Sequence, residues 1–225
     1  DAPLRRPWID WIHTAKDQGA LLRDYTKWDD EPRSAGAIVE TMLRANQMAR
    51  SEPPGPVYVC LDAGLQESAL EEEIKIPDVS RFQPSAPPQA SVKAVKEVAD
   101  MLLGASNPVI MIGRSGRSQQ AWDNRVKLAE AIGAGVFTNL RNSAVFPSDH
   151  LLHVGRPAGR ITDTMRSTVT EADVVLSLNW LDFGGTQRLL TRDGELKGKI
   201  VHCSMEEYVH NGFGGELFEL PMADI

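Results

Sequence analysis

Cysteine is almost absent from this chain, since only Cys60 and Cys203 occur among its 225 residues. The two lie far apart and no Cys-x-x-Cys pair exists, which excludes a disulfide framework and a cysteine-based metal or redox motif. Each falls inside a predicted strand, where cysteine usually packs as a small hydrophobic side chain. We therefore expect two buried thiols without a chemical role.

Long apolar runs and an excess of positive charge are also missing. No stretch is long enough to cross a bilayer and no basic leader precedes an apolar segment, so we expect a cytoplasmic protein without a membrane partner. Asp and Glu number 31 against 24 Lys and Arg, a formal net charge of -7 that argues against nucleic acid as a partner. Hydrophobic residues make up 42% of the chain, which is enough for a packed core.

The first part of the chain predicts one helix and one strand, followed by a linker. Apolar residues recur at a helical period over 34–51, and a turn rich in proline leads into β-branched and aromatic residues over 57–62. Beyond them come acidic residues and scattered prolines without helical periodicity. We expect residues 1–66 to belong to one domain, residues 67–90 to form a linker, and residues 91–225 to form a second domain.

Strand and helix patterns alternate through the second domain. Strands are predicted at 108–112, 136–138, 173–178 and 200–203. Helices are predicted at 91–103, between 117 and 133, and around 161–169. This alternation indicates an α/β fold, a Rossmann-like and mostly parallel sheet with helices on both faces.

A glycine-containing loop, Gly113-Arg114-Ser115-Gly116, stands between a predicted strand and a predicted helix. Backbone amides in that position can hold a phosphate group of a bound cofactor. Ser115 occupies the place where the dinucleotide motif has glycine, and Arg117 occupies the second glycine of the serine-hydrolase motif. The loop is therefore either a tight turn or a nucleotide contact.

His150 and His153 follow Phe146 and Pro147 in a predicted loop. A metal site would need further ligands and usually a helical pair of histidines, so zinc is not favoured. An imidazole titrates near neutral pH and loops often carry function, which leaves a catalytic role for a loop histidine open.

Several segments resemble thiamine-diphosphate-dependent enzymes. Residues 27–34, which read Lys-Trp-x-x-Glu-Pro-x-Ser, the helix after them and residues 55–59 are similar to the end of the pyrimidine-binding domain of that superfamily. Residues 106–113 and 172–176 resemble strands of its central domain. The resemblance covers nearly the whole chain.

Within this superfamily the likeness is to the benzoylformate decarboxylases. It is carried by residues 27–34 and by Phe146-Pro147-x-x-His150, which leads to Pro157-Ala158-Gly159. The resemblance implies a parent enzyme that uses thiamine diphosphate and magnesium to cleave or form a carbon–carbon bond next to a keto group.

His150 aligns with the loop histidine that benzoylformate decarboxylases bring to the active site. The resemblance therefore implies that His150 transfers a proton or orients the substrate. Leu151 departs from the proline common after that histidine.

The resemblance also implies what the chain lacks. The family's activating glutamate belongs to the first half of the pyrimidine domain, and the Gly-Asp-Gly metal motif is missing, since Arg192 precedes Asp193-Gly194. We expect that the chain alone neither binds thiamine diphosphate nor catalyses a reaction. Its expected partners are the missing pyrimidine and diphosphate domains, within a homo-oligomer that is a dimer or tetramer.

Three functions stay open at this point. The first is the middle portion of a thiamine-diphosphate-dependent decarboxylase or carboligase with a structural and interface role. Some relatives hold FAD or ADP in the central domain, and residues 113–116 occupy the corresponding position. The second is therefore a stand-alone Rossmann-like module that binds NAD, FAD or ADP. The third is an oligomerisation fragment that responds to no ligand.

Overall fold

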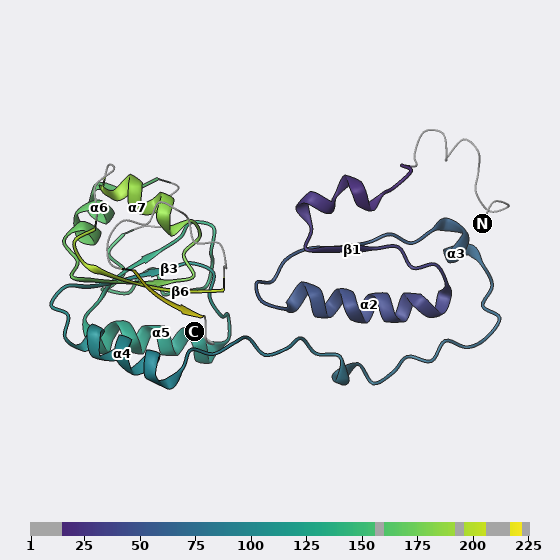
Figure 1. The fold of residues 1–225 in the computed structure, drawn as a ribbon, viewed down its shortest axis with the longest axis horizontal. Helices are drawn as coiled ribbons and strands as arrows, with labels where there is room; N and C mark the ends of the chain where they lie inside the picture. Colours follow the sequence, from purple (N-terminus) through teal and green to yellow (C-terminus); the bar gives the residue numbers. More distant parts are fainter. Residues whose placement is uncertain (1–14, 156–159, 192–195, 206–216, 222–225) are drawn as a thin grey trace. The chain divides into compact units, whose positions relative to one another are not determined.

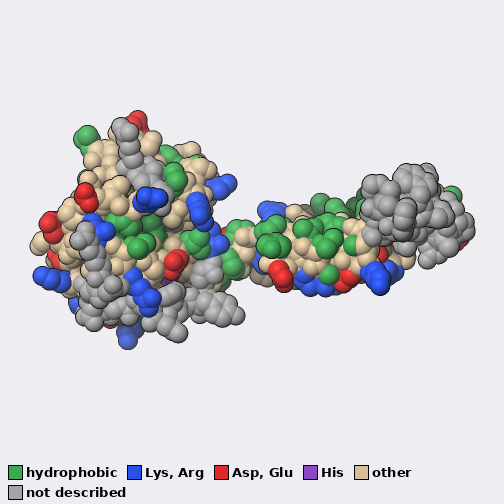
Figure 2. Space-filling view, turned by 90° about the horizontal axis from the view of Figure 1, so that it is seen from above, with side chains coloured by type: hydrophobic (Ala, Val, Ile, Leu, Met, Phe, Trp, Pro, Cys, Tyr) green, Lys and Arg blue, Asp and Glu red, His purple; other side chains and the backbone are tan. Residues whose placement is uncertain are grey.

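The computed structural model describes residues 15–155, 160–191, 196–205 and 217–221. The chain divides into two compact units, Asp1–Ala86 and Pro87–Ile225. None of the helices in the described ranges combines the length and the apolar character that a membrane-spanning segment needs. Figure 2 shows acidic and basic side chains interspersed on the visible face of each unit, without a continuous basic stripe there.

The first unit is built around a β-α-β arrangement (Figure 1). Strands β1 (Trp28–Asp30) and β2 (Val57–Val59) pair in parallel, and helix α2 (Ala35–Arg50) connects them. The shorter elements are η1 (Gly19–Leu21), η2 (Arg23–Tyr25), α3 (Ala63–Glu67) and η3 (Val79–Arg81).

Polar side chains hold both ends of α2. The hydroxyl of Ser34 accepts a hydrogen bond from the Ala37 amide at the start of the helix. The ammonium group of Lys27 donates to the carbonyls of Ser51 and Pro53 just past its end, at 2.6 and 3.0 Å. Lys27 thus stabilises the segment that leads into β2.

The second unit contains one five-stranded parallel sheet of order β4-β3-β5-β6-β7. Its strands are β3 (Pro108–Ile112), β4 (Gly135–Thr138), β5 (Val174–Leu178), β6 (Lys199–Ser204) and β7 (Leu217–Pro221). Every residue of β3 and β5 is buried, as the continuous apolar runs predict.

Helices cover both faces of this sheet (Figure 1). Helices α4 (Val92–Leu103) and α5 (Gln119–Ile132) lie on one face, and α6 (Asp163–Thr170) and α7 (Phe183–Thr191) lie on the other. Two apolar clusters result, one that joins Val98 and Leu102 to the sheet and one that joins Met165 and Phe183 to it. The α/β fold with helices on both faces is confirmed.

Besides the short 3-10 helices, two helices and two strands were not expected from the sequence: β1, α3, α7 and β7. The predicted strand over 57–62 is shorter, because β2 ends at Val59 and Asp62 begins α3 as its N-cap. Cys203 is buried as expected, whereas Cys60 lies just past β2 and is only half-buried.

One segment beyond β4 returns along its outer edge. The Val136 amide donates to the Leu152 carbonyl at 2.7 Å, and the Val154 amide donates to the Val136 carbonyl at 3.1 Å. The loop between Thr138 and Leu152, which carries His150, is therefore anchored to β4 at both ends.

Candidate functional site

The order of the strands identifies the edge of the sheet where a ligand is expected. The chain passes from β3 to β4 on one side and then to β5 on the other side of β3, so the direction of winding reverses between β3 and β5. Open α/β sheets bind ligands outside the carboxyl ends of their strands at such a reversal. The segments after β3, β4 and β5 therefore form the candidate site.

The loop after β3 packs directly against the segment after β5. The amides of Gly113 and Arg114 donate to the carbonyls of Leu178 and Asn179, at 2.9 and 3.0 Å. A Cβ atom on Gly113 would lie 2.1 Å from the Asn179 carbonyl oxygen. Glycine is therefore required here by the close approach of two backbones.

Ser115 occupies the middle of the same loop. Its hydroxyl oxygen is buried and has no hydrogen-bond partner among the described residues. Helix α5 begins three residues further on, where the Ser118 hydroxyl accepts from the Ala121 amide and caps the helix. The loop therefore combines a tight turn with one unpaired hydroxyl.

Asn179 joins the ends of three neighbouring strands. Its side-chain amide donates to the Arg114 carbonyl at 2.8 Å, and its side-chain oxygen accepts from the Ser204 hydroxyl at 2.8 Å. Its backbone φ of 48° lies in the left-handed region, which asparagine tolerates better than most residues. No local sequence pattern indicates this role of Asn179.

Arg125 links the glycine loop to the loop after β4. It is 1% exposed, and its guanidinium donates to the Val145 carbonyl at 2.8 Å and to the Gly116 carbonyl at 2.9 Å. Burial lowers the pKa of Arg125, although an arginine stays protonated at neutral pH. Arg125 was not predicted from the sequence. Its position on the apolar side of a helix, between Trp122 and Ala129, is the pattern that could have indicated a buried and hydrogen-bonded arginine.

His150 lies in the loop after β4 with both ring nitrogens engaged. Nδ1 accepts from the Leu152 amide at 3.2 Å, and Nε2 lies 3.3 Å from a carboxylate oxygen of Glu130. Because Nδ1 is an acceptor, a neutral ring carries its hydrogen on Nε2 and donates it to Glu130. The ring also meets Phe146 edge to face, with centroids 5.2 Å apart.

His153 makes a separate contact, with its Nε2 3.0 Å from the Thr138 hydroxyl. No group of three or more His, Cys, Asp or Glu side chains in the described ranges could hold a metal ion. Asp193-Gly194 and Pro157-Ala158-Gly159 lie outside the described residues.

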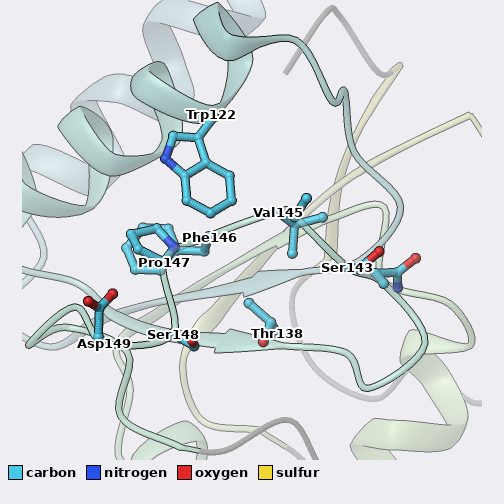
Figure 3. A pocket seen from close by; sticks show the side chains of 10 residues that line it. Trp122, Thr138, Ser143, Val145, Phe146, Pro147, Ser148 and Asp149 are labelled. Atoms are coloured by element: carbon cyan, nitrogen blue, oxygen red, sulfur yellow. The ribbon is translucent and has the colours of Figure 1, made fainter.

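Two pockets open beside these loops. The larger, of about 430 Å³, is lined by Trp122, by Thr138 and by residues 142–149 (Figure 3). The smaller, of about 140 Å³, lies on the face covered by α6 and α7 and includes Asn139, Arg160 and Trp180. Neither is lined by the glycine loop or by His150.

The topology and the loops together define a doubly wound α/β domain with its candidate site at the carboxyl edge of a parallel sheet. Residues 95–208 match the family model of the central domain of thiamine pyrophosphate enzymes. The chain belongs to this family of thiamine pyrophosphate enzymes.

Curated relatives are enzymes of this family. The chain is 28% identical to a probable acetolactate synthase large subunit of Methanocaldococcus jannaschii, over 72% of this chain and 28% of the relative. It is 28% identical to the glyoxylate carboligase of Escherichia coli O157:H7, over 63% of this chain and 23% of the relative. The chain thus spans about a quarter of the length of these relatives.

A solved structure has the same fold. Benzoylformate decarboxylase from Polynucleobacter necessarius aligns with a TM-score of 0.68 and 18% identity, over 98% of this chain and 41% of that one. At this identity the likeness concerns the fold alone.

Proposed function

We propose that this chain is the central-domain portion of a thiamine-diphosphate-dependent 2-keto acid decarboxylase or carboligase of the benzoylformate decarboxylase kind. The observation that carries the proposal is the match of residues 95–208 to the family's central domain in a chain that covers only about a quarter of its relatives. In this proposal residues 1–66 are the end of a pyrimidine-binding domain and residues 67–90 are a linker. The chain has a structural and interface role.

Absence of activity in the chain alone belongs to the same proposal. Thiamine diphosphate, when bound with magnesium in a parent enzyme, supplies the carbon nucleophile that attacks a 2-keto acid. Isothermal titration of the chain with thiamine diphosphate and magnesium should give no binding, and benzoylformate should release no carbon dioxide. Tight binding or turnover by this chain would contradict the proposal.

We also propose that His150 is the residue this domain contributes to the active site of the parent. Support comes from the resemblance alone, in which His150 aligns with the loop histidine of the benzoylformate decarboxylases. In this structure its Nε2 lies 3.3 Å from Glu130 in the last turn of α5, beside the amino end of β4. Its role is to move a proton or orient the substrate, which would require Nε2 to leave Glu130.

The test uses the longest protein that the reading frame encodes around this chain. His150→Asn should lower kcat by about 100-fold or more and change the pH profile of kcat, as removal of a general acid or base does. Glu130→Gln is the control, since it keeps the ring and should leave kcat within about threefold. If His150→Asn lowers the melting temperature and leaves kcat unchanged, His150 has a structural role and the proposal is wrong.

A stand-alone nucleotide-binding module is the second candidate. It is favoured by the Ser115 hydroxyl between β3 and the start of α5, which has no hydrogen-bond partner among the described residues. Against it stands the contact between Gly113 and Asn179, which fills the space at the reversal point with backbone.

A thermal-shift experiment separates the two candidates. NAD, FAD or ADP at 100 times its Kd would stabilise a binding-competent fold by about 2.7 kcal/mol. The module is supported if the melting temperature rises with one of them and the rise is lost in Ser115→Val. No response to any of the three rejects it.

Assembly completes the proposal. The parent should be a homo-oligomer, a dimer or tetramer, in which the pyrimidine and diphosphate domains pack around this central domain. Light scattering after gel filtration of that longer protein measures the mass directly, and a monomer would contradict this part.

A further inference from the structure

The pocket beside Trp122 in the second unit has the dimensions of a small-molecule site, and its interpretation does not depend on the proposed function. Its volume of about 430 Å³ falls in the range of ligand pockets. Figure 3 shows the indole of Trp122 projecting from α5 toward the loop, with Phe146 and Pro147 on one side and Val145 on the other. Helix, strand end and loop therefore border one open hollow.

The loop that forms most of this pocket is held in place by a buried side chain of α5. The Val145 carbonyl accepts from the buried guanidinium of Arg125. Ala144 has a φ of 56°, in the left-handed region where an alanine costs about 1 kcal/mol or more. The contacts around this loop therefore hold Ala144 in a backbone conformation that is unfavourable for alanine.

Several polar side chains that line the pocket make no hydrogen bond to a described residue, whereas the Thr138 hydroxyl lies 3.0 Å from His153 Nε2. No hydrogen bond within the described residues involves the indole N–H of Trp122 or the side chains of Asn142, Ser143 and Ser148. Within the described residues, a ligand would displace no hydrogen-bond partner of these donors and acceptors.

The charge in the pocket has one sign. The Asp149 carboxylate is the single charged group among the lining residues, and it makes no ion pair or hydrogen bond with any described residue. In Figure 3 it lies at one edge of the pocket, beyond Pro147. A cation is attracted both to this carboxylate and to the face of an indole ring.

We propose that this pocket binds an organic cation with a flat apolar body, of the arylalkylamine class. The apolar body lies against the half-buried indole of Trp122, since Val145 and Phe146 are nearly fully buried and form only the floor of the pocket. The ammonium group pairs with Asp149. An anionic 2-keto acid is disfavoured here, since its charge has the same sign as that of Asp149. The site is therefore distinct in charge preference from one that accepts a 2-keto acid.

The probe is phenylethylammonium, compared with phenylethanol and phenylacetate, which keep the aromatic body and change the charge. Titrations of the full chain, labelled with ¹⁵N at its five tryptophans, follow the indole N–H signals. The amine should give a saturable shift of one signal that Trp122→Leu removes. The alcohol should bind at least threefold more weakly, and phenylacetate at least tenfold more weakly.

Asp149→Lys tests the charge preference at an exposed position that the fold tolerates. It should weaken the amine at least tenfold and should favour phenylacetate over the amine. Glu171→Lys is the matched control, because it makes the same charge change at an exposed position at the end of α6, outside the pocket. Amine affinity in this control should stay within twofold.

Three results would overturn the proposal. The first is that the amine gives no saturable shift, and the second is that amine and phenylacetate bind with equal affinity. The third is that Asp149→Lys leaves the preference for the amine over phenylacetate unchanged. Trp122→Leu changes a half-buried side chain and is judged only if its spectrum keeps the dispersion of a folded protein. If it unfolds, the Asp149→Lys comparison alone decides.

Discussion

Gly113 stands where the backbones after β3 and β5 come closest. An added methyl group would lie 2.1 Å from the Asn179 oxygen and 2.6 Å from the Trp180 Cα. Both neighbours are main-chain atoms, so a rotamer change cannot make room. A single added methyl group therefore tests whether the two backbones at Gly113 are as close as the structure shows.

Gly113→Ala should lower the free energy of unfolding by about 3 kcal/mol, the upper end of overpacking costs. Gly135→Ala is the control in the same sheet, because its methyl group would meet the Val154 side chain at an ordinary 3.4 Å. The control should change stability by less than about 1 kcal/mol. Urea unfolding of both variants measures the difference, and equal values would contradict the close approach.

His202 is a second residue whose surroundings matter, since it is buried beside Ser177 with 3.0 Å between Nδ1 and the hydroxyl oxygen. Burial lowers the pKa of His202 below its ordinary value. Above about pH 6.5 both the folded and the unfolded chain hold this imidazole neutral, so it causes no pH dependence. Below that pH the unfolded chain takes up the proton first, and stability falls.

Between about pH 6.5 and the lowered pKa of His202, its contribution to stability should therefore fall by at most about 1.4 kcal/mol per pH unit. His202→Gln should lack this component, so that its stability curve is flatter than that of the original chain below pH 6.5. Urea titrations at several pH values provide the curves. Parallel curves would show that the protonation of His202 is not linked to folding.

At the scale of elements, helix α5 contacts two loops through the side chain of Arg125. The glycine loop lies at its start and the loop after β4 lies along its buried side, and Arg125 donates to a carbonyl of each. A buried carbonyl that loses its donor costs about 1–3 kcal/mol. Both loops should therefore loosen together when this side chain is removed.

Arg125→Met keeps the length of the side chain and removes its donors. We expect a loss of about 1–3 kcal/mol in stability and faster amide exchange in residues 114–118 and 143–150. Lys127→Met is the control on the exposed side of α5 and should change neither. Unchanged exchange in one of the two loops would contradict the coupling.

Most elements of the second unit were predictable because each has a local signal. The buried strands β3 and β5 are continuous apolar runs, and α4 and α5 begin at serines whose hydroxyls cap the helix. Gly133 ends α5 with a φ of 63°, as a glycine after a helical pattern indicates. Such signals depend on neighbours in sequence, so they can be read without the structure.

The elements that were missed have weak local signals. Helix α7 contains Gly184 and Gly185, which disfavour a helix, and begins after Asp182, whose carboxylate accepts from the Gly185 amide at 3.0 Å. Strand β1 has three residues, two of them aspartates, and exists because it pairs with β2. Tertiary packing decides both elements.

The candidate site was predictable only in part for the same reason. Residues 113–116 and His150 could be identified as loop segments. The hydrogen bonds from Asn179 to Arg114 and from Arg125 to Val145 join residues 65 and 20 positions apart. No local pattern in the sequence indicates which distant carbonyl a buried side chain will reach.

At the scale of the whole molecule, the two units differ in how much they can bury. The described part of the first unit has one helix of several turns on two short strands, and Met42 on that helix is 52% exposed. The second unit has five strands and two apolar clusters. Two strands alone are only marginally stable in water, whereas a five-stranded sheet covered by helices can be stable by itself.

Residues 87–225 produced alone should therefore unfold cooperatively, with the melting temperature of the full chain within a few degrees. Residues 1–86 produced alone should show no cooperative transition. Circular dichroism during heating measures both. A cooperative transition in residues 1–86 would show that this unit needs no further partner, and would weaken the proposal that it is the end of a larger domain.

The return of the chain along β4 has a consequence for solubility. An open outer strand exposes a row of amides and carbonyls to which a strand of another molecule can add, the first step of many aggregates. Here the Leu152 carbonyl and the Val154 amide already occupy the two backbone groups of Val136. Changes that shorten or detach this segment should therefore be seen first as precipitation at high protein concentration, before any loss of secondary structure.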